Sequence, residues 1–487
     1  MLMVRRRILP RLCILVIGAL LGGLVYPAWA QPQTALAQQQ TAPASESPST
    51  GSGQPLTLDQ AVATGLKFSP RIAASADTLQ ASRALVTQAY AANSLTANLQ
   101  VTQTEVSAVP TFTLPVPAPP PQNVAFETVS FGRTHQTQAQ ATVAKPLWTG
   151  GRVAAAVRQA KAGETASRED LRRTYQTVNN DVKHAYYAVL LAEELVKVAD
   201  QATAAAREHL RVAEANLAAG TAPRFDVLRA EAQVAQNEQN GIQARNGLDL
   251  ARAALNNAMG VPQSKEYRLT SPLALPQPET TPLDALVKQA QSDRPEVGQA
   301  QAQVAAFAAA ADFARSEKQP QLGVAWVYSK VLNASIVQVT NWTLAFQASL
   351  LVFNGKQTDA AIEHARSQQR AARAQLDQVQ QGIALQVRQA FLSVNSARER
   401  VIAATKGVAQ AEEAHRIATV RYNAGVSIGV EVLDAEAALT AARSNYAQAV
   451  YDYNAATADL EYAIGAWRPP AEPPTLRLSP PREKSKS

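Results

Sequence analysis

The feature that most limits how this chain can fold is an internal duplication. The motif LWTG at residues 147–150 is matched by VFNG at 352–355, and the Ala-Gly pair at 219–220 recurs at 424–425, each 205 residues later. A period of this size is far longer than the roughly 20 to 50 residues of solenoid repeats. The 487 residues are therefore predicted to contain two copies of one domain-sized unit.

The two copies differ by one insertion. The offset between them is 225 residues at the start, where Leu58 matches Leu283, and falls to 205 afterwards. The extra residues lie where the first copy alone carries a proline-rich stretch, 110–121. Proline cannot donate to a β ladder. This stretch is predicted to be an exposed loop that joins two strands at the outer end of the molecule and stays out of the sheet.

Each copy contains a long stretch without proline and with a coiled-coil pattern. Apolar residues recur in steps of three and four from Leu171 to Ala206, and again from Ile383 to Ala411, and this 3.5-residue period is typical of coiled coils. Gly220 and Gly425 stand where such helices would end. Each half is therefore predicted to form a long antiparallel helical hairpin.

A pair of alternating segments precedes each hairpin. Large apolar residues, among them Trp326, Trp342, Leu344 and Phe346, occupy every second position, and uncharged polar residues such as Asn, Gln, Thr and Ser occupy the positions between them. Apolar-out, polar-in alternation is the signature of outer-membrane β-barrel strands, although half-buried soluble strands alternate too. We expect these four aromatic and aliphatic side chains to face lipid.

The first thirty residues are typical of an export signal. Arg5 to Arg7 precede an apolar run, and Ala28-Trp29-Ala30 is a small-x-small cleavage pattern. The one cysteine, Cys13, lies within this segment, so thiol chemistry and disulfides are excluded from the mature chain. No later apolar run reaches about 18 residues. If the chain enters a membrane, it must do so with strands.

Four strands in one chain cannot close a barrel, and open strand edges are not tolerated in hydrocarbon. Two copies would give eight strands, about the number whose interior side chains fill, whereas three give twelve and leave a lumen. We therefore expect a homotrimer.

The duplicated order of short helix, strand pair, LWTGG or LVFNGK, and long helix, ending in RYNAGVSIGVEVLDAEAAL and AIGAW, resembles the TolC-like outer-membrane efflux protein family. The resemblance covers nearly all of residues 55–467. It implies a mainly α fold with a β-barrel part: a trimer with a 12-stranded outer-membrane β-barrel continued by a 12-helix periplasmic α-barrel.

The expected organisation of the chain follows from both arguments. It consists of a signal peptide at 1–30, a disordered linker at 31–54, repeat 1 at 55–275 (strands about 95–109 and 126–148, helices about 150–219 and 223–259), repeat 2 at 276–467 (strands about 321–333 and 340–353, helices about 355–424 and 427–464), and a disordered tail at 468–487.

The resemblance also implies a function, namely the exit duct of a tripartite efflux pump, with a periplasmic adaptor and an inner-membrane pump or ABC transporter as partners. The family's periplasmic gate residues correspond to Tyr422, Asp226, Glu431 and Asp434. Its tip turns, where adaptors dock, correspond to Ala219, Gly220, Arg421, Ala424 and Gly425. Ser427 stands where some members carry an Arg, so the pattern of salt bridges at the gate is left open. An alternative without a gating role treats Glu431 and Asp434 as solvated acids in the first turn of a helix and Tyr422 as a hydrophobic staple.

Other functions are weighed on the same residues. The export segment holds four of the arginines, and without it the formal net charge falls from +7 to +3. A chain so near neutrality, without a Lys/Arg block, has no electrostatic footprint for nucleic acid. No motif for a metal, cofactor or enzymatic nucleophile is present, and all five histidines (His135, His184, His209, His364 and His415) are expected at the surface. A type I protein secretion duct, a periplasmic coiled-coil adaptor and a purely structural coiled coil stay open, and so does the cargo: drugs, metals or secreted protein.

Overall fold

The computed structural model describes residues 54–108, 111–117, 119–121, 124–130, 135–275, 281–332 and 340–468. The expected signal peptide, nearly all of the linker, and the tail beyond Arg468 lie outside these described residues.

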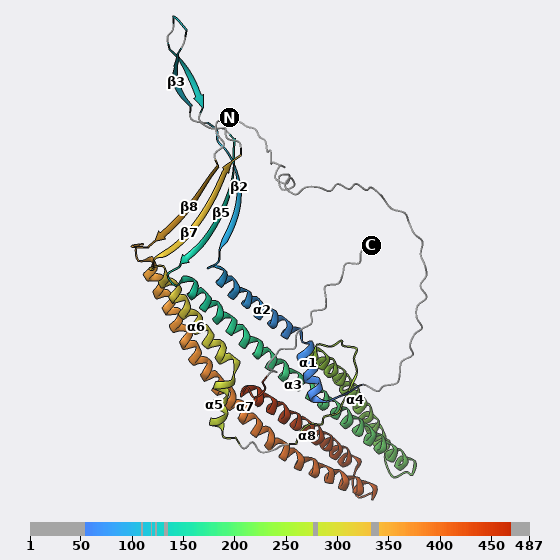
Figure 1. Ribbon diagram of the computed structural model, residues 1–487. Helices are drawn as coiled ribbons and strands as arrows, with labels where there is room; N and C mark the ends of the chain where they lie inside the picture. The colour runs from blue at the N-terminus through green and yellow to red at the C-terminus, as the bar shows by residue number, and fades with distance from the viewer. Residues whose placement is uncertain are drawn as a thin grey trace, which may run out of the picture. The chain divides into compact units, whose positions relative to one another are not determined.

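The helices of the two halves match in length (Figure 1). Short helices of 11 residues are followed by helices of 22 residues, then by long helices of 67 residues, and then by return helices of 36 and 35 residues. Repeat 1 contains α1 (Leu58–Phe68), α2 (Pro70–Ala91), α3 (Arg152–Ala218) and α4 (Arg224–Met259), and repeat 2 contains α5 (Leu283–Asp293), α6 (Pro295–Ser316), α7 (Gln357–Asn423) and α8 (Gly429–Ala463). At about 1.5 Å per residue, α3 and α7 are each about 100 Å long.

Two antiparallel hairpins result, because α3 packs along α4 and α7 packs along α8. The hairpins also join each other: α3 contacts α8, and α6 lies against both long helices. Within the described chain, no helix is both long and apolar enough to cross a bilayer.

Four strands form one antiparallel sheet in the order β2-β5-β7-β8. They are β2 (Thr96–Glu105), β5 (His135–Trp148), β7 (Gln321–Val331) and β8 (Thr340–Ser349). The two central strands, β5 and β7, come from different repeats. The duplicated units are therefore joined through the sheet as well as through the helices, and β2 and β8 are its two edges.

The register places most of the large apolar residues of the four strands on one face. One row across the sheet is Leu99, Ala141, Tyr328 and Trp342, and the next is Ala97, Val143, Trp326 and Leu344. The opposite face has rows such as Gln100, Gln140, Ser329 and Asn341. The first face is thus mainly apolar, with Lys145 and Lys330 among its other members, and the opposite face is uncharged and mainly polar, although β7 places Ala325, Val327 and Val331 on it.

The prediction for the proline-rich insert was wrong in one respect. Residues Thr111–Pro117 form strand β3, which pairs with β4 (Val124–Ser130) in a separate two-stranded sheet. Pro115 pairs with Phe126 in this register, which a proline can do because both strands are edges and its missing N–H can face outward. The strand expected at 126–148 is accordingly two strands, β4 and β5.

Each repeat has its own apolar core around the middle of its long helix. In repeat 1, Tyr186 is fully buried, and its hydroxyl donates to the Leu56 carbonyl at 3.1 Å and accepts from the Ser271 amide at 3.0 Å. Leu56 is the last residue of β1 (Gln54–Leu56), which pairs in parallel with β6 (Tyr267–Leu269), and Ser271 follows β6. One tyrosine thus connects α3 to both ends of repeat 1.

Candidate functional site at the helical tips

Both hairpins turn through the same backbone motif. Gly220 has a φ of 72° and Gly425 a φ of 70°, in the left-handed region that favours glycine. The amide of Thr221 donates to the Asn216 carbonyl at 2.9 Å, and that of Val426 donates to the Arg421 carbonyl at 3.0 Å. These are the bonds of a Schellman motif, so the two Ala-Gly sequences end α3 and α7 in the same way.

The turns are open to contact from outside the chain. Ala219, Gly220, Arg421, Ala424 and Gly425, which were predicted as docking residues, are all exposed. Beside them, sequence reasoning missed a group of exposed apolar side chains, namely Phe225, Leu228, Val420, Val426 and Ile428. Apolar residues on either side of an Ala-Gly turn are the signal that could have found them, since exposed apolar patches mark interaction sites.

Tyr422 packs against the other hairpin of its own chain. Its ring centroid lies 5.3 Å from that of His209 on α3, and its hydroxyl accepts from the Asn216 side-chain amide at 3.5 Å. Within the described residues, Tyr422 makes no hydrogen bond to a carboxylate of its own chain. The contact that Tyr422 makes in one chain is therefore an aromatic one between α7 and α3, with only a long hydrogen bond.

His209 corrects a second expectation, because it is buried, with 8% of its surface exposed. Burial lowers the pKa of its imidazole, and the nearby charge of Asp226 on α4 partly opposes that shift. The spacing 202, 206, 209, 213 of buried residues on α3 is the signal that places it on the packed face. Asp226 itself is half-buried in the first turn of α4.

Glu431 lies in a local network of repeat 2. Its Oε2 accepts from the Ser427 hydroxyl at 2.8 Å and lies 3.4 Å from the Arg421 guanidinium. Ser427, which stands where some family members carry an arginine, thus contacts this acid directly. Asp434 is exposed. Exposed ion pairs of this kind contribute about 0 to 1 kcal/mol, so the charge of the acids at the tip matters more than their pairing.

The structure therefore divides the four predicted gate residues into two sets. Tyr422 packs on His209 and Asp226 acts on it electrostatically, whereas Glu431 and Asp434 lie on the exposed start of α8. Aromatic packing at the α3–α7 contact and an acidic surface at the start of α8 are the chemistry available here.

The predicted lipid-facing residues share the apolar face of the sheet and are exposed in the single chain. Trp342 and Phe346 are 66% and 75% exposed. Trp326 stacks on Tyr328 with centroids 6.1 Å apart, and Leu344 pairs with Trp326 across β7 and β8.

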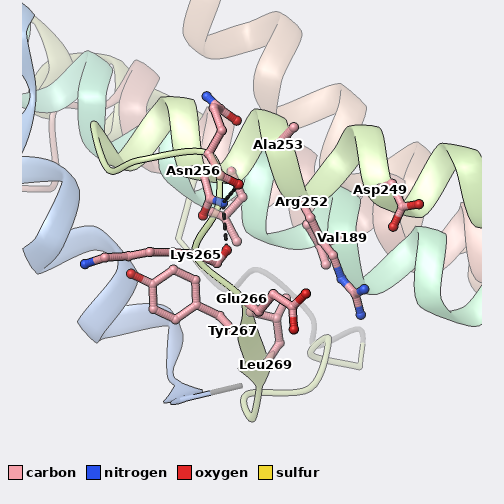
Figure 2. Close-up of a pocket in the computed structure, with 11 residues that line it drawn as sticks. Val189, Asp249, Arg252, Ala253, Asn256, Lys265, Glu266, Tyr267 and Leu269 are labelled. Atoms are coloured by element: carbon pink, nitrogen blue, oxygen red, sulfur yellow. Dashed lines mark hydrogen bonds between the residues drawn. The ribbon is translucent and has the colours of Figure 1, made fainter. Parts of the chain in front are cut away.

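A cavity of about 220 Å³ lies beside the end of α4 and β6 (Figure 2). Its central polar group, the side-chain amide of Asn256, donates to the carbonyls of Gln263 and Lys265 at 3.2 and 2.9 Å. This amide holds the loop that follows α4. Across the described residues, no group of three or more His, Cys, Asp or Glu side chains could hold a metal ion.

Comparison with known proteins agrees with this architecture. The model of the outer membrane efflux protein family matches residues 56–261 and 286–466. The chain is 25% identical over 317 residues to the alkaline protease secretion protein AprF of Pseudomonas aeruginosa, covering 63% of this chain and 65% of AprF. It is 24% identical over 354 residues to the outer membrane efflux protein BepC of Brucella suis, covering 71% of this chain and 77% of BepC.

Solved structures share the fold. The outer membrane channel CmeC of Campylobacter jejuni superposes with a TM-score of 0.68 at 15% identity, over 85% of this chain and 87% of that one. The expected fold class, with helical and sheet parts arranged as in TolC-like channels, is confirmed, as is the assignment to a channel family instead of an enzyme class. Membership places the chain in the outer membrane with a periplasmic extension. Because the family model matches most of both repeats, the chain belongs to the outer membrane efflux protein family.

Proposed function

We propose that this protein is the outer-membrane exit duct of a tripartite efflux pump, which passively conducts small molecules from the periplasm to the exterior. The observation that carries the proposal is the four-stranded sheet with one mainly apolar face, one uncharged and mainly polar face, and two open edges. Such a sheet suits a membrane on one side and water on the other, provided that its edges are paired.

The proposed assembly is a homotrimer. Three copies supply twelve strands, so that β8 of one copy pairs with β2 of the next and no edge remains in lipid. Trp326, Trp342, Leu344 and Phe346 then contact outer-membrane lipid, and the polar rows line the lumen. Native mass measurement in mild detergent tests this, and a monomer that stays folded with unpaired edges would contradict it.

The proposed gate lies at the hairpin tips. Contacts of Tyr422 with His209 and Asn216 hold α7 against α3, and the acids Glu431 and Asp434 from three copies give a negative mouth that favours cations. The exposed apolar and glycine-containing turns are the proposed docking surface for a periplasmic adaptor, which connects the duct to an inner-membrane pump.

A second candidate is the outer-membrane component of a type I protein secretion system. The similarity to AprF, whose name assigns it to alkaline protease secretion, favours this reading, whereas BepC is named as an efflux protein. Affinity purification of cross-linked complexes from the native envelope separates the two. A pump partner driven by the proton gradient supports efflux, and an ABC transporter with a secreted polypeptide supports secretion.

The channel itself is tested in planar bilayers. Purified protein is expected to give discrete, cation-preferring conductance steps. Protein that assembles correctly yet never conducts would contradict the proposal for both cargoes.

A further inference from the structure

Glu436 on α8 is a buried acid with no role in the proposed gate. Only 6% of its surface is exposed, and its Oε1 lacks a hydrogen-bond partner within the described residues. Burying an unpaired carboxylate is costly, and the group responds by taking up a proton. A residue that costs stability when ionised, two helical turns from a proposed gate, calls for a functional explanation.

The position of Glu436 follows from the contacts above and below it on α8. At Gly429, a Cβ atom would lie 3.5 Å from both His209 Nε2 on α3 and Tyr422 Cε2 on α7. Gly429 precedes Glu436 by seven residues, which is two turns, or about 10 Å. The aromatic contact at the tip is therefore directly above Glu436.

On the side of Glu436 away from the tip, Arg443 connects α8 to both α3 and α7. Its guanidinium donates to Gln201 on α3 at 2.9 Å and to Glu412 on α7 at 2.8 Å, and it follows Glu436 by another seven residues, about 10 Å. Because α8 touches both α3 and α7 in both layers, Glu436 lies inside the three-helix junction that connects the tip to the rest of the hairpins.

The immediate surroundings are apolar. On α8 itself Val432, Leu433 and Leu439 are buried, and the levels that match Glu436 on the other helices carry the buried alanines Ala206 on α3 and Ala418 on α7.

The charged groups of the three helices near this level are paired elsewhere or exposed, and the charged form of the two histidines is disfavoured by burial. Arg207 pairs with Glu238, Glu208 with Arg211, Glu413 with Arg416, Glu412 with Arg443 and Glu431 with Arg421, and Asp434 is exposed. Burial lowers the pKa of both His209 and His415, the latter assisted by Arg443.

Among the described groups no cation compensates it, and burial raises the pKa of Glu436 from 4.5 to about 7. A raised acid pKa means that the packed state prefers the protonated form. Packing is then strongest below about pH 4.5, weakens as the pH rises from about 4.5 to about 7, and stays weakened above that. A buried histidine has the opposite sign, since packing around His209 weakens as the pH falls.

We propose that Glu436 is a proton-binding site of the hairpin tip: when protonated it stabilises the packing of α8 on α3 and α7, and when ionised it loosens that junction and eases opening. The effect on conductance rests on the proposed gate, whereas the effect on packing does not. Acidification would therefore favour the closed duct.

The duplication provides a matched control. Glu231 in α4 stands 205 residues before Glu436, at the equivalent position of repeat 1, and is exposed. Glu231→Gln removes the same charge without touching the junction. Glu436→Gln mimics the protonated acid, and Glu436→Met tests the site with an apolar side chain of similar size.

The test is amide hydrogen exchange of α8 in the full-length protein in detergent, between pH 5 and pH 8, with rates corrected for intrinsic exchange. In the wild type and in Glu231→Gln, exchange over 430–450 is expected to rise on the order of a hundredfold as the pH rises. In Glu436→Gln and Glu436→Met it is expected to be flat, or to rise slightly toward acid because of His209. Wild-type pH dependence in both Glu436 variants, or none in the wild type, would overturn the site.

Single-channel recordings over the same pH range separate this inference from the gate. If open probability rises with pH in the wild type and not in Glu436→Gln, both proposals are supported. If exchange responds to Glu436 while conductance does not, the proton site stands and the gate at the tip is wrong.

Discussion

Removing the ring of Tyr422 should open the tip, and removing only its hydroxyl should not. The ring packs on His209 with centroids 5.3 Å apart, whereas the hydroxyl is 3.5 Å from the Asn216 amide, which is at the outer limit of a hydrogen bond. Tyr422→Phe should therefore cost about 0.5 kcal/mol or less. Tyr422→Ala loses an aromatic contact and the burial of a half-exposed ring, about 1 to 2 kcal/mol per chain.

The trimer multiplies this difference. If three tips must separate together, the ring deletion removes about 3 to 6 kcal/mol from the closed state, and a shift of about 3 kcal/mol changes an open-to-closed ratio on the order of a hundredfold. The assay is open probability and conductance in planar bilayers. Leu217→Ala is the matched control, because Leu217 is the repeat 1 counterpart of Tyr422 and is 37% exposed.

Two outcomes would refute the reasoning. Equal opening by Tyr422→Phe and Tyr422→Ala would show that the hydroxyl, bonded to an acid of a neighbouring copy, holds the gate. Wild-type behaviour of both variants in a correctly assembled trimer would remove Tyr422 from the gate and leave it as a packing residue.

Three further predictions concern charge, the sheet and the core. Glu431→Ala combined with Asp434→Ala should reduce cation preference, measured as a smaller reversal potential in a salt gradient, and an unchanged potential would place the acids away from the mouth. Deleting the β3–β4 hairpin should leave assembly intact in detergent, since among the described residues those strands pair only with each other, and loss of trimers would show that they join neighbouring copies. Tyr186→Phe should lower stability by about 1 to 3 kcal/mol, seen as a lower melting temperature, because it removes a donor to the Leu56 carbonyl; an unchanged melting temperature would show that the bond contributes nothing net.

The hairpins and the four main strands were predictable because their signals are local and appear twice. The coiled-coil seam of α3 was predicted less well. Leu171 and Val189 are buried, as the pattern from Leu171 to Ala206 requires, but its later steps fall on Val196 and Ala199, which are half-buried, whereas Val198 and Ala202 are buried. A single period of apolar residues describes a helix that packs against one partner, whereas α3 contacts α2, α4, α6 and α8 along its length. Where the partner changes, the buried stripe moves around the helix.

Long-range contacts were beyond reach for a different reason. Tyr186 is buried because β1 and β6, whose paired residues Leu56 and Leu269 are far apart in sequence, meet at its hydroxyl. No periodicity of α3 encodes that meeting. The β3–β4 hairpin was missed because the prolines were read as excluding any strand. Proline disfavours only central strands, and in a two-stranded pair both strands are edges.

The duplication also shows where the two halves have taken different roles. Their hairpins keep the same cross-helix ion pair with the signs exchanged, Arg207 with Glu238 in repeat 1 and Glu412 with Arg443 in repeat 2. Geometry is thus retained while the charges are free to differ, as expected for exposed pairs of small energy.

At the tip the halves differ in kind. The repeat 2 counterpart of His209 on α3 is Ala414, and the repeat 1 counterpart of Tyr422 on α7 is Leu217. The corresponding pair, Leu217 and Ala414, therefore lacks both aromatic rings. Six hairpins around a proposed trimer axis therefore alternate in chemistry, and their closure has threefold and not sixfold symmetry. Since each Tyr422–His209 contact lies within one chain, it acts on the proposed gate by fixing the spacing of that chain's two hairpins, and contacts between chains are left to exposed side chains at the tips.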